Sequence, residues 1–346
     1  MADTFTSDLI VSAAPHIRTR LSMPRAMWFV SAALLPSIAW AGFVFGVYVI
    51  LVTAVAIFAA MLTELCITCA LKRPVTMLDG SAFLTGLLVA CNMPAAGVLP
   101  LYVPITASVF AIAVAKHAFG GIGQNWINPA LAGRIFVFFA WLPAMTGGWA
   151  VPANFDAVSS ATGFDALSTA TPLNILKFGT LAAEHSALPS YSDLFFGFVP
   201  GCIGEVSALL LIAGGLVLIA LKIVNWEIPL AYIATAALLS WVFGGLAVSG
   251  QVPAFFSGDP LYHILSGGIM LGAFFMATDW VTTPMTFKGR ILFGIGCGII
   301  TILIRLTGHN VEGVSFAIVL MNITVPLIEK LFRRRRFGVS GEKGAA

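Results

Sequence analysis

Charged side chains are scarce in this chain of 346 residues, and the scarcity excludes most classes of soluble protein. Only 10% of the residues are charged, whereas 59% are hydrophobic and the mean hydropathy is strongly positive. Soluble globular domains carry about 25% charged residues. The composition therefore predicts an integral membrane protein. A formal net charge of +3, spread along the chain, is too small to favour a nucleic-acid partner.

Three further absences restrict the class of membrane protein to which the chain can belong. The amino-terminal segment contains Asp3, Arg18 and Arg20 but no apolar core of the length that a signal peptide needs, so we expect it to be retained and not translocated. No dinucleotide-binding glycine fingerprint follows a strand, so we expect no nicotinamide site in this chain. Cys66 and Cys69 form a Cys-x-x-Cys pair, but no second pair would complete an iron–sulfur or zinc set. We expect buried structural thiols and no metal site.

Long apolar runs take the place of charge. A helix needs about 20 residues to cross a bilayer, and ten runs suggest crossings, although several are short. The third run ends in "CNMP", where Asn92 and Pro94 would break a helix, which predicts a half-crossing segment. The predicted fold class is all-α, with about ten transmembrane helices, some of them interrupted. The expected segments are 26–42, 45–70, 81–93, 102–119, 129–146, 194–223, 229–248, 261–278, 290–306 and 313–332.

Basic residues indicate the orientation of these segments. With ten crossings both termini lie on one side, and all Lys and Arg residues except Lys177 and Arg305 fall on that side. The positive-inside bias assigns it to the cytoplasm. The predicted organisation is a cytoplasmic arm (1–25), a first membrane repeat (26–146), an exterior loop (147–192), a second membrane repeat (193–332) and a cytoplasmic basic tail (333–346).

The chain also repeats itself. "FLTGLLVACNMP" at Phe83 resembles "ILSGGIMLGAFF" at Ile264, and "GQNWINPALAGRIFVF" at Gly123 resembles "GHNVEGVSFAIVLM" at Gly308, at offsets of 181 and 185 residues. An odd number of crossings separates the copies, so the second copy is inverted in the membrane. Two inverted five-helix repeats with interrupted helices form a transporter architecture, with a site near the repeat interface. Chance similarity among Gly-rich helices is the alternative, and the nearly common offset argues against it.

Several blocks together resemble one family of redox subunits. The blocks are "SAFLTGLLVACNMP", "GGIGQNWINPALAGR", "DALSTATPL", "SGGIMLGAFFMATD" and "GHNVEGVSFAIVLMNITVPLIE". They are similar to the D subunits of Rnf ion-translocating electron-transport complexes and to the related B subunits of sodium-pumping NADH:quinone reductases. The shorter amino-terminal arm favours the Rnf members. One departure is "ATDWVTTP", where the family pattern has proline after Asp279 and this chain has Trp280.

The resemblance implies FMN joined through its phosphate to a threonine hydroxyl, within an Asp-x-x-Ser-(Gly or Thr)-Ala-Thr pattern. The resemblance implies Thr171 as the acceptor, with Thr169 as its nearest competitor. A phosphoester needs a hydroxyl, and Pro172 favours an extended backbone at Thr171, so we expect an exposed loop that a flavin transferase can reach. A solvated connection is the alternative for a Ser/Thr-rich loop. The residues of the pattern are Asp165, Ser168, Thr169, Ala170 and Thr171.

A second candidate site is "GGIGQNWINPALAGR", at a predicted cytoplasmic turn. Asn125 and Asn128 are three residues apart, which would place them on one helical face. Their amides can donate and accept hydrogen bonds at the polar edge of a flavin ring, and the resemblance implies a noncovalent riboflavin on this side. The alternative is that the two residues cap the next helix, with Pro129 in its first turn.

Carboxylates inside the membrane are energetically expensive and are therefore candidate functional groups. Glu205 is expected near the middle of the sixth crossing, where it could serve an ion path or pair with a neighbouring subunit. Glu64, Asp279 and Glu312 are expected nearer the ends of their segments.

The predicted function is that of a membrane redox subunit that passes electrons between a flavin at each face, with no catalytic acid–base residue of its own. The resemblance implies a complex that couples electron flow between reduced ferredoxin and NAD to sodium or proton movement in a bacterial or archaeal inner membrane. It also implies the A, B, C, E and G subunits of an Rnf complex as partners, lipid around the chain and a flavin transferase for maturation. Two alternatives stay open: a quinone-reductase subunit, and a channel or transporter for a small neutral solute.

Overall fold

The computed structural model describes residues 21–74, 76–95, 99–147, 149–150, 152, 171–178, 188–246, 255–308 and 311–332. Within these ranges the regular secondary structure is helical, and the β-type pairing is limited to an isolated bridge between Pro94 and Cys202. The all-α prediction is confirmed for the described chain. The amino-terminal arm up to residue 20, most of the loop 147–192 and the basic tail lie outside it.

Four described helices are long and apolar enough to cross a membrane: α1 (Met23–Phe45), α2 (Val47–Ala70), α13 (Phe287–Thr307) and α14 (Val314–Leu331). Large apolar side chains such as Phe58 and Leu327 are exposed on them, as a lipid-facing surface requires. The chain therefore has the character of a multi-pass membrane protein. Shorter apolar helices are α3 (Ser81–Cys91), α4 (Tyr102–Phe110) with its π-helical continuation η2 (Ala111–His117), α5 (Pro129–Ala140), α9 (Ala208–Ala220) and α10 (Glu227–Phe243).

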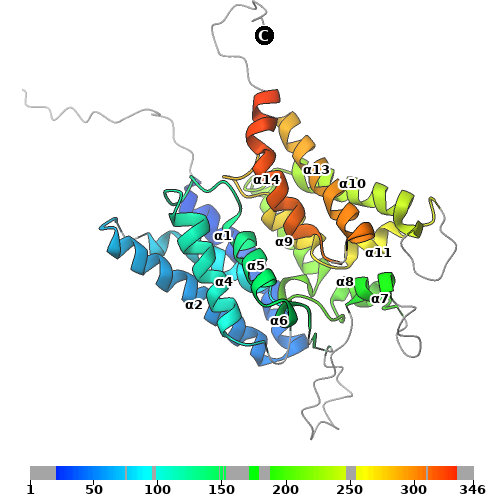
Figure 1. Ribbon diagram of the computed structural model, residues 1–346, viewed down its shortest axis with the longest axis horizontal. Helices are drawn as coiled ribbons and strands as arrows, with labels where there is room; N and C mark the ends of the chain where they lie inside the picture. The colour runs from blue at the N-terminus through cyan, green and yellow to red at the C-terminus, as the bar shows by residue number, and fades with distance from the viewer. Residues whose placement is uncertain are drawn as a thin grey trace, which may run out of the picture.

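The helices form two groups that meet in the middle of the molecule (Figure 1). Helices α1 to α5 lie together on one side, and α10, α13 and α14 lie on the other. Contacts of α1 with α9 and of α5 with α14 join the groups. Close packing within the second group depends on Gly294 and Gly298 of α13, where a Cβ atom would approach the carbonyl oxygen of Ile228 and the Cβ of Thr235 to 2.8 and 2.7 Å.

Several predicted helices are interrupted at the place where the two groups meet. Helix α3 ends at Cys91, as expected from the Asn and Pro that follow. The exposed backbone after it pairs with the second half of the chain: the Ala95 N–H donates to the carbonyl of Gly201 at 3.1 Å, and the Ile203 N–H donates to the carbonyl of Met93 at 2.9 Å. The backbone groups at one helix break thus form hydrogen bonds with those at the other. Inside a membrane such groups must be paired, because no water is present to bind them.

The prediction of one continuous helix over 194–223 is wrong. The structure has α8 (Tyr191–Phe196), the short 3₁₀ turn η3 (Ile203–Glu205) and then α9. The physical cause lies in "GFVPG": Gly197 adopts a left-handed φ of 95° that ends α8, and Pro200 cannot continue a helix. Glu205 therefore lies in the break and not in the middle of a helix.

Two more predicted segments are divided. The segment 261–278 contains α11 (Pro260–Leu265), α12 (Ile269–Leu271) and the π-helical η5 (Gly272–Met276), because "SGG" follows α11 and Gly267 has a φ of 70°. The segment 129–146 contains α5 and the short α6 (Leu142–Thr146), which begins with a proline in its first turn. Helix length in this chain is thus shorter than its apolar runs suggest.

Candidate functional site

Thr171 directly precedes α7 (Pro172–Phe178) and lines a cavity of about 170 Å³. Its hydroxyl oxygen accepts the N–H of Asn174 at 3.4 Å. The side chain is only 5% exposed, so the expected exposure of the acceptor is wrong for this residue. The other residues of the attachment pattern, Asp165, Ser168, Thr169 and Ala170, lie outside the described ranges.

Helix α7 holds Thr171 inward through contacts along its length. Leu173 is buried, and Leu176 packs beside Leu194 and Tyr262. Lys177 donates hydrogen bonds from Nζ to the carbonyl oxygens of Arg305, at 2.7 Å, and of Gly308, so it satisfies the carboxyl-terminal end of α13. Burial lowers the pKa of Lys177. These contacts explain why Thr171, at the end of a Ser/Thr-rich connection, packs against the protein and is not exposed to solvent.

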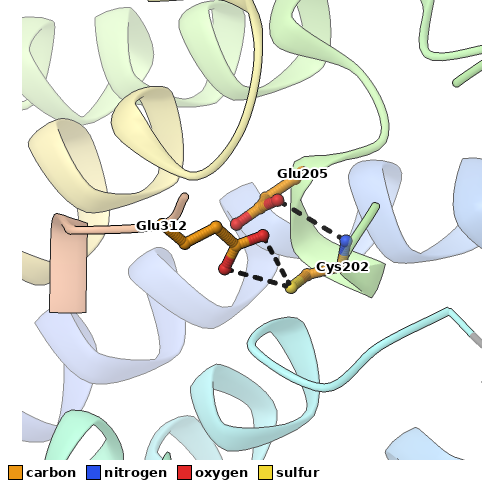
Figure 2. A group of neighbouring side chains, drawn as sticks. All are labelled: Cys202, Glu205 and Glu312. Atoms are coloured by element: carbon orange, nitrogen blue, oxygen red, sulfur yellow. Dashed lines mark hydrogen bonds between the residues drawn. The ribbon is translucent and has the colours of Figure 1, made fainter. Parts of the chain in front are cut away.

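A buried polar cluster lies beside the Thr171 cavity, at the junction of the two helix groups. Arg134 of α5 forms an ion pair with Glu312 and donates a hydrogen bond to Ser315 of α14, and its guanidinium also approaches the sulfur of Cys202 at 3.9 Å. Figure 2 shows Cys202 and Glu205 on one segment, with Glu312 reaching toward them from the loop before α14. The backbone N–H of Cys202 donates to Glu205 at 3.5 Å.

This cluster is better described as an ion-pair network than as a metal centre. Cys202, Glu205 and Glu312 offer three ligand atoms that all lie within 4.8 Å of one another. The guanidinium of Arg134 is already paired with Glu312, however, and its positive charge opposes a cation at the same place. These three side chains therefore do not support the presence of a metal site.

Sequence reasoning missed Arg134 as a site residue and used it only as a marker of topology. The side chain is 7% exposed and lies between the two helix groups. The signal was available, because Arg134 falls five residues inside the predicted segment 129–146. A charge placed within an apolar segment must find a partner, and Glu312, in the matching block of the second repeat, was a candidate carboxylate.

A second cavity, of about 100 Å³, contains both predicted asparagines in its wall. Asn128 caps α5: its oxygen accepts the N–H groups of Ala130 and Leu131, and its amide donates to the carbonyl of Met276 at 3.2 Å. The capping alternative is thus confirmed for Asn128. Asn125 lies in the preceding loop and donates to the carbonyl of Ile127 at 3.2 Å. Since α5 begins at Pro129, the expectation that both share a helical face is wrong.

Lys116 lines the same cavity and was also used only as a marker of topology. Its Nζ lies 2.6 Å from a carboxylate oxygen of Glu64 and 2.7 Å from the hydroxyl of Ser81. Thr76 donates to the other oxygen of Glu64 at 2.7 Å. Lys116 belongs to the π-helical η2, and the π-helical η5 forms part of the same cavity wall through Phe274. Such π-helical turns occur frequently at functional sites.

The position where the sequence departs from the family pattern also borders this cavity. Trp280 and Asp279 both line it. The indole N–H of Trp280 donates to the carbonyl of Ile223 at 2.7 Å, and Asp279 accepts a hydrogen bond from Thr282 at 3.2 Å. Tryptophan therefore supplies an anchor to the connection after α9, which a proline could not supply.

The Cys-x-x-Cys pair is not buried, contrary to expectation. Cys66 and Cys69 are exposed and free, whereas Cys91, Cys202 and Cys297 are buried and free. Helix α2 buries a different face, which includes Ala56, Ala60 and Glu64. The pair therefore faces the surroundings of the helix bundle.

Comparisons with known proteins agree along nearly the whole chain. The NQR2, RnfD, RnfE family matches residues 10–338. The D subunit of a Na⁺-translocating ferredoxin:NAD⁺ oxidoreductase complex from Acetobacterium woodii is 44% identical over 341 residues, covering 98% of each chain. The D subunit of a proton-translocating ferredoxin:NAD⁺ oxidoreductase complex from Clostridium ljungdahlii is 43% identical over 95% of this chain and 96% of its own. The D subunit of an ion-translocating oxidoreductase complex from Stutzerimonas stutzeri is 36% identical over 92% of this chain and 93% of its own.

Proposed function

Since this chain belongs to the NQR2, RnfD, RnfE family, we propose that it is the D subunit of an ion-translocating ferredoxin:NAD oxidoreductase, an Rnf complex, and relays electrons through bound flavins. The similar relatives carry names of such subunits over almost their full lengths. The observation that carries the proposal is the placement of Thr171, the last residue of the attachment pattern, in the wall of a cavity that has a polar side and an aromatic side.

Thr171 is the proposed attachment point of FMN. With flavin adenine dinucleotide as the donor, the hydroxyl oxygen of Thr171 would form a bond to the phosphorus on the riboflavin side while the bond within the pyrophosphate breaks. AMP would leave, and the hydroxyl proton would pass to a base of the flavin transferase. Thr171 is buried once α7 is docked. The transferase would therefore have to modify it before α7 packs against the protein, or while α7 is displaced.

The residues around Thr171 fit a flavin ester. Arg134 and Asn174 provide polar groups, and Phe138, Trp149 and Phe316 provide aromatic walls. The bound flavin supplies one- and two-electron redox chemistry, while the protein sets its position and potential. The aromatic side chains would exclude water from the flavin, and the buried polar groups would orient its phosphate.

A noncovalent riboflavin is proposed for the second cavity, on the predicted cytoplasmic side. Asn125 is the better ligand of the two predicted asparagines, since both the oxygen and the nitrogen of the Asn128 amide are engaged in capping α5 and in holding η5. Lys116, paired with Glu64, adds a buried hydrogen-bond donor to the same wall.

The proposed topology is ten crossings in two inverted five-helix repeats, with both termini in the cytoplasm. The paired breaks at Pro94 and Cys202 support the interrupted helices of this arrangement. In this arrangement the electron path runs from one membrane face to the other between two fixed flavins. The A, B, C, E and G subunits of the Rnf complex would surround the chain, together with lipid.

The identity of the coupling ion does not follow from similarity. The relative named as Na⁺-translocating and the relative named as proton-translocating are 44% and 43% identical to this chain. A quinone-reductase subunit stays the alternative within the family, and a solute channel stays the alternative outside it. A channel would have no use for the attachment pattern that ends at Thr171.

Intact mass and in-gel fluorescence test the proposal. The full chain is co-expressed with a flavin transferase, and the wild-type band should fluoresce under ultraviolet light after denaturation and carry the mass of one added FMN. Thr171→Val keeps the β-branched shape but removes the oxygen that forms the ester, so covalent flavin should be absent. Thr169→Val is the matched control and should stay labelled. A fluorescent Thr171→Val band, or an unmodified wild-type chain, would remove the basis of the proposal.

A further inference from the structure

One nitrogen of the Arg134 guanidinium, Nε, has no hydrogen-bond partner among the described residues. Its two terminal nitrogens donate to Ser315 and Glu312, which fixes the plane of the group. Its Nε is buried, and no acceptor among the described residues lies within hydrogen-bond reach of it. A buried donor without an acceptor is costly, so an acceptor is expected at this position when the site is complete.

Arg134 also shares a cavity with Thr171. Arg134, Thr171 and Glu312 all line the space of about 170 Å³ between α5, α7 and α14. Arg305 is the other buried arginine among the described residues, and its Nε is likewise without an acceptor. Its terminal nitrogens hold the carbonyl oxygens of His263 and Ser266, however, and it borders a separate, smaller cavity that Thr171 does not line. Arg134 is thus the arginine placed to meet a group attached at Thr171.

The local charges show why a group attached at Thr171 needs a cation beside it if that group is an anion. Glu205 and Glu312 both border a small cavity that Thr171 also lines, so an anion introduced at Thr171 would meet two carboxylates unless a cation offset them. Guanidinium binds phosphate oxygens through adjacent N–H groups, and such charge-assisted bonds are among the strongest in proteins.

We propose that Arg134 binds the phosphodiester formed at Thr171, donating from Nε to a non-bridging phosphate oxygen. This inference rests on the proposed FMN ester. In the complete site the same guanidinium bridges Glu312 and the phosphate, and the position of the attached flavin is tied to the contact between α5 and α14. Arg134 is accordingly a positioning residue, because it acts on the phosphate and not on the ring.

The test measures how much the ester raises the midpoint temperature of unfolding. The full chain is purified in detergent with and without co-expressed transferase, as wild type, as Glu312→Gln and as Glu312→Gln combined with Arg134→Gln. The double variant removes both charges of the ion pair, so Glu312 is not left as a carboxylate without its partner. Intact mass establishes in each preparation whether the ester is present.

In the wild type the ester should raise the midpoint by roughly 3 °C, the size expected for one charge-assisted hydrogen bond. The rise should be at least as large in Glu312→Gln, where Arg134 no longer serves a carboxylate, and should be lost in the double variant. Equal rises in the two variants, or an esterified wild type with no rise, would overturn the inference while leaving the ester intact. A wild type without ester would instead overturn the proposed function.

If the double variant fails to fold, Arg134→Lys serves in its place. Lysine keeps the charge but lacks the Nε–H and the planar fork, so less than half of the rise should survive. A full rise in Arg134→Lys would mean that charge alone, and not the guanidinium, holds the phosphate.

Discussion

The buried pair of Lys116 and Glu64 gives a prediction with a calculable size. The two side chains are 4% and 1% exposed, and their charged atoms lie 2.6 Å apart. Lys116→Met would leave Glu64 buried with the hydroxyl of Thr76 as its close partner and with His117 at 3.9 Å. Breaking a buried pair by removing one partner costs about 3–5 kcal/mol. Replacing both partners, as Lys116→Met with Glu64→Gln, should cost much less, because no buried charge is then left alone.

Thermal unfolding in detergent, followed with a thiol-reactive dye, measures the difference. The buried thiols of Cys91 and Cys297 report unfolding, and the exposed Cys66 and Cys69 give a constant background. At about 2–4 °C per kcal/mol for a large domain, the single variant should lose roughly 6 °C or more, and the double variant should recover at least half of the loss.

The control for this experiment is the exposed Lys288. Lys288→Met should change the midpoint by less than about 2 °C, because surface charges contribute little to stability. Equal midpoints for Lys116→Met and the double variant would refute the reasoning, since the loss would then come from packing and not from an unpaired carboxylate.

Two further predictions concern orientation and the second flavin. In a cysteine-free background, Ser159→Cys should react with an impermeant maleimide on intact cells and Ser340→Cys should not; labelling of the 340 position alone would reverse the topology. Asn125→Ala should weaken riboflavin binding roughly tenfold to a hundredfold, as expected for one lost amide hydrogen bond, measured as extractable riboflavin per covalent FMN under flavin-limited conditions. Asn128→Ala should chiefly destabilise α5, by about 1 kcal/mol for a lost cap; an unchanged riboflavin ratio in the Asn125→Ala/Asn128→Ala double variant would remove both residues from the site.

The apolar runs predicted most helices because membrane spans depend mainly on local composition. The expected break after Cys91 followed from "CNMP" and is present. The break before Glu205 was missed although "GFVPG" marks it, because the hydropathy of the run outweighed its local turn residues. A run of apolar residues shows that a segment is buried or faces lipid, but it does not show whether one helix fills the segment.

The candidate sites were harder to predict, since they depend on partners far apart in sequence. Thr171 could be identified from a local pattern, but its burial depends on Leu173 and Lys177 docking against distant helices. Arg134 and Lys116 were assigned to the membrane boundary because charge in an apolar chain usually lies there. Their carboxylate partners are 178 and 52 residues away, and a single sequence does not pair such positions.

The backbone bonds between Met93–Ala95 and Gly201–Ile203 bear on how far the two halves can move. Transporters of inverted-repeat design work by rocking one half against the other around a central site. Here that motion would break the hydrogen bonds that Ala95 and Ile203 donate across the junction. Each backbone group left unpaired inside a membrane costs several kcal/mol. The junction therefore holds the two halves in a fixed arrangement. Under the proposed function, a junction that does not move would keep the two flavins at a constant separation, which favours electron tunnelling between them and not solute transport.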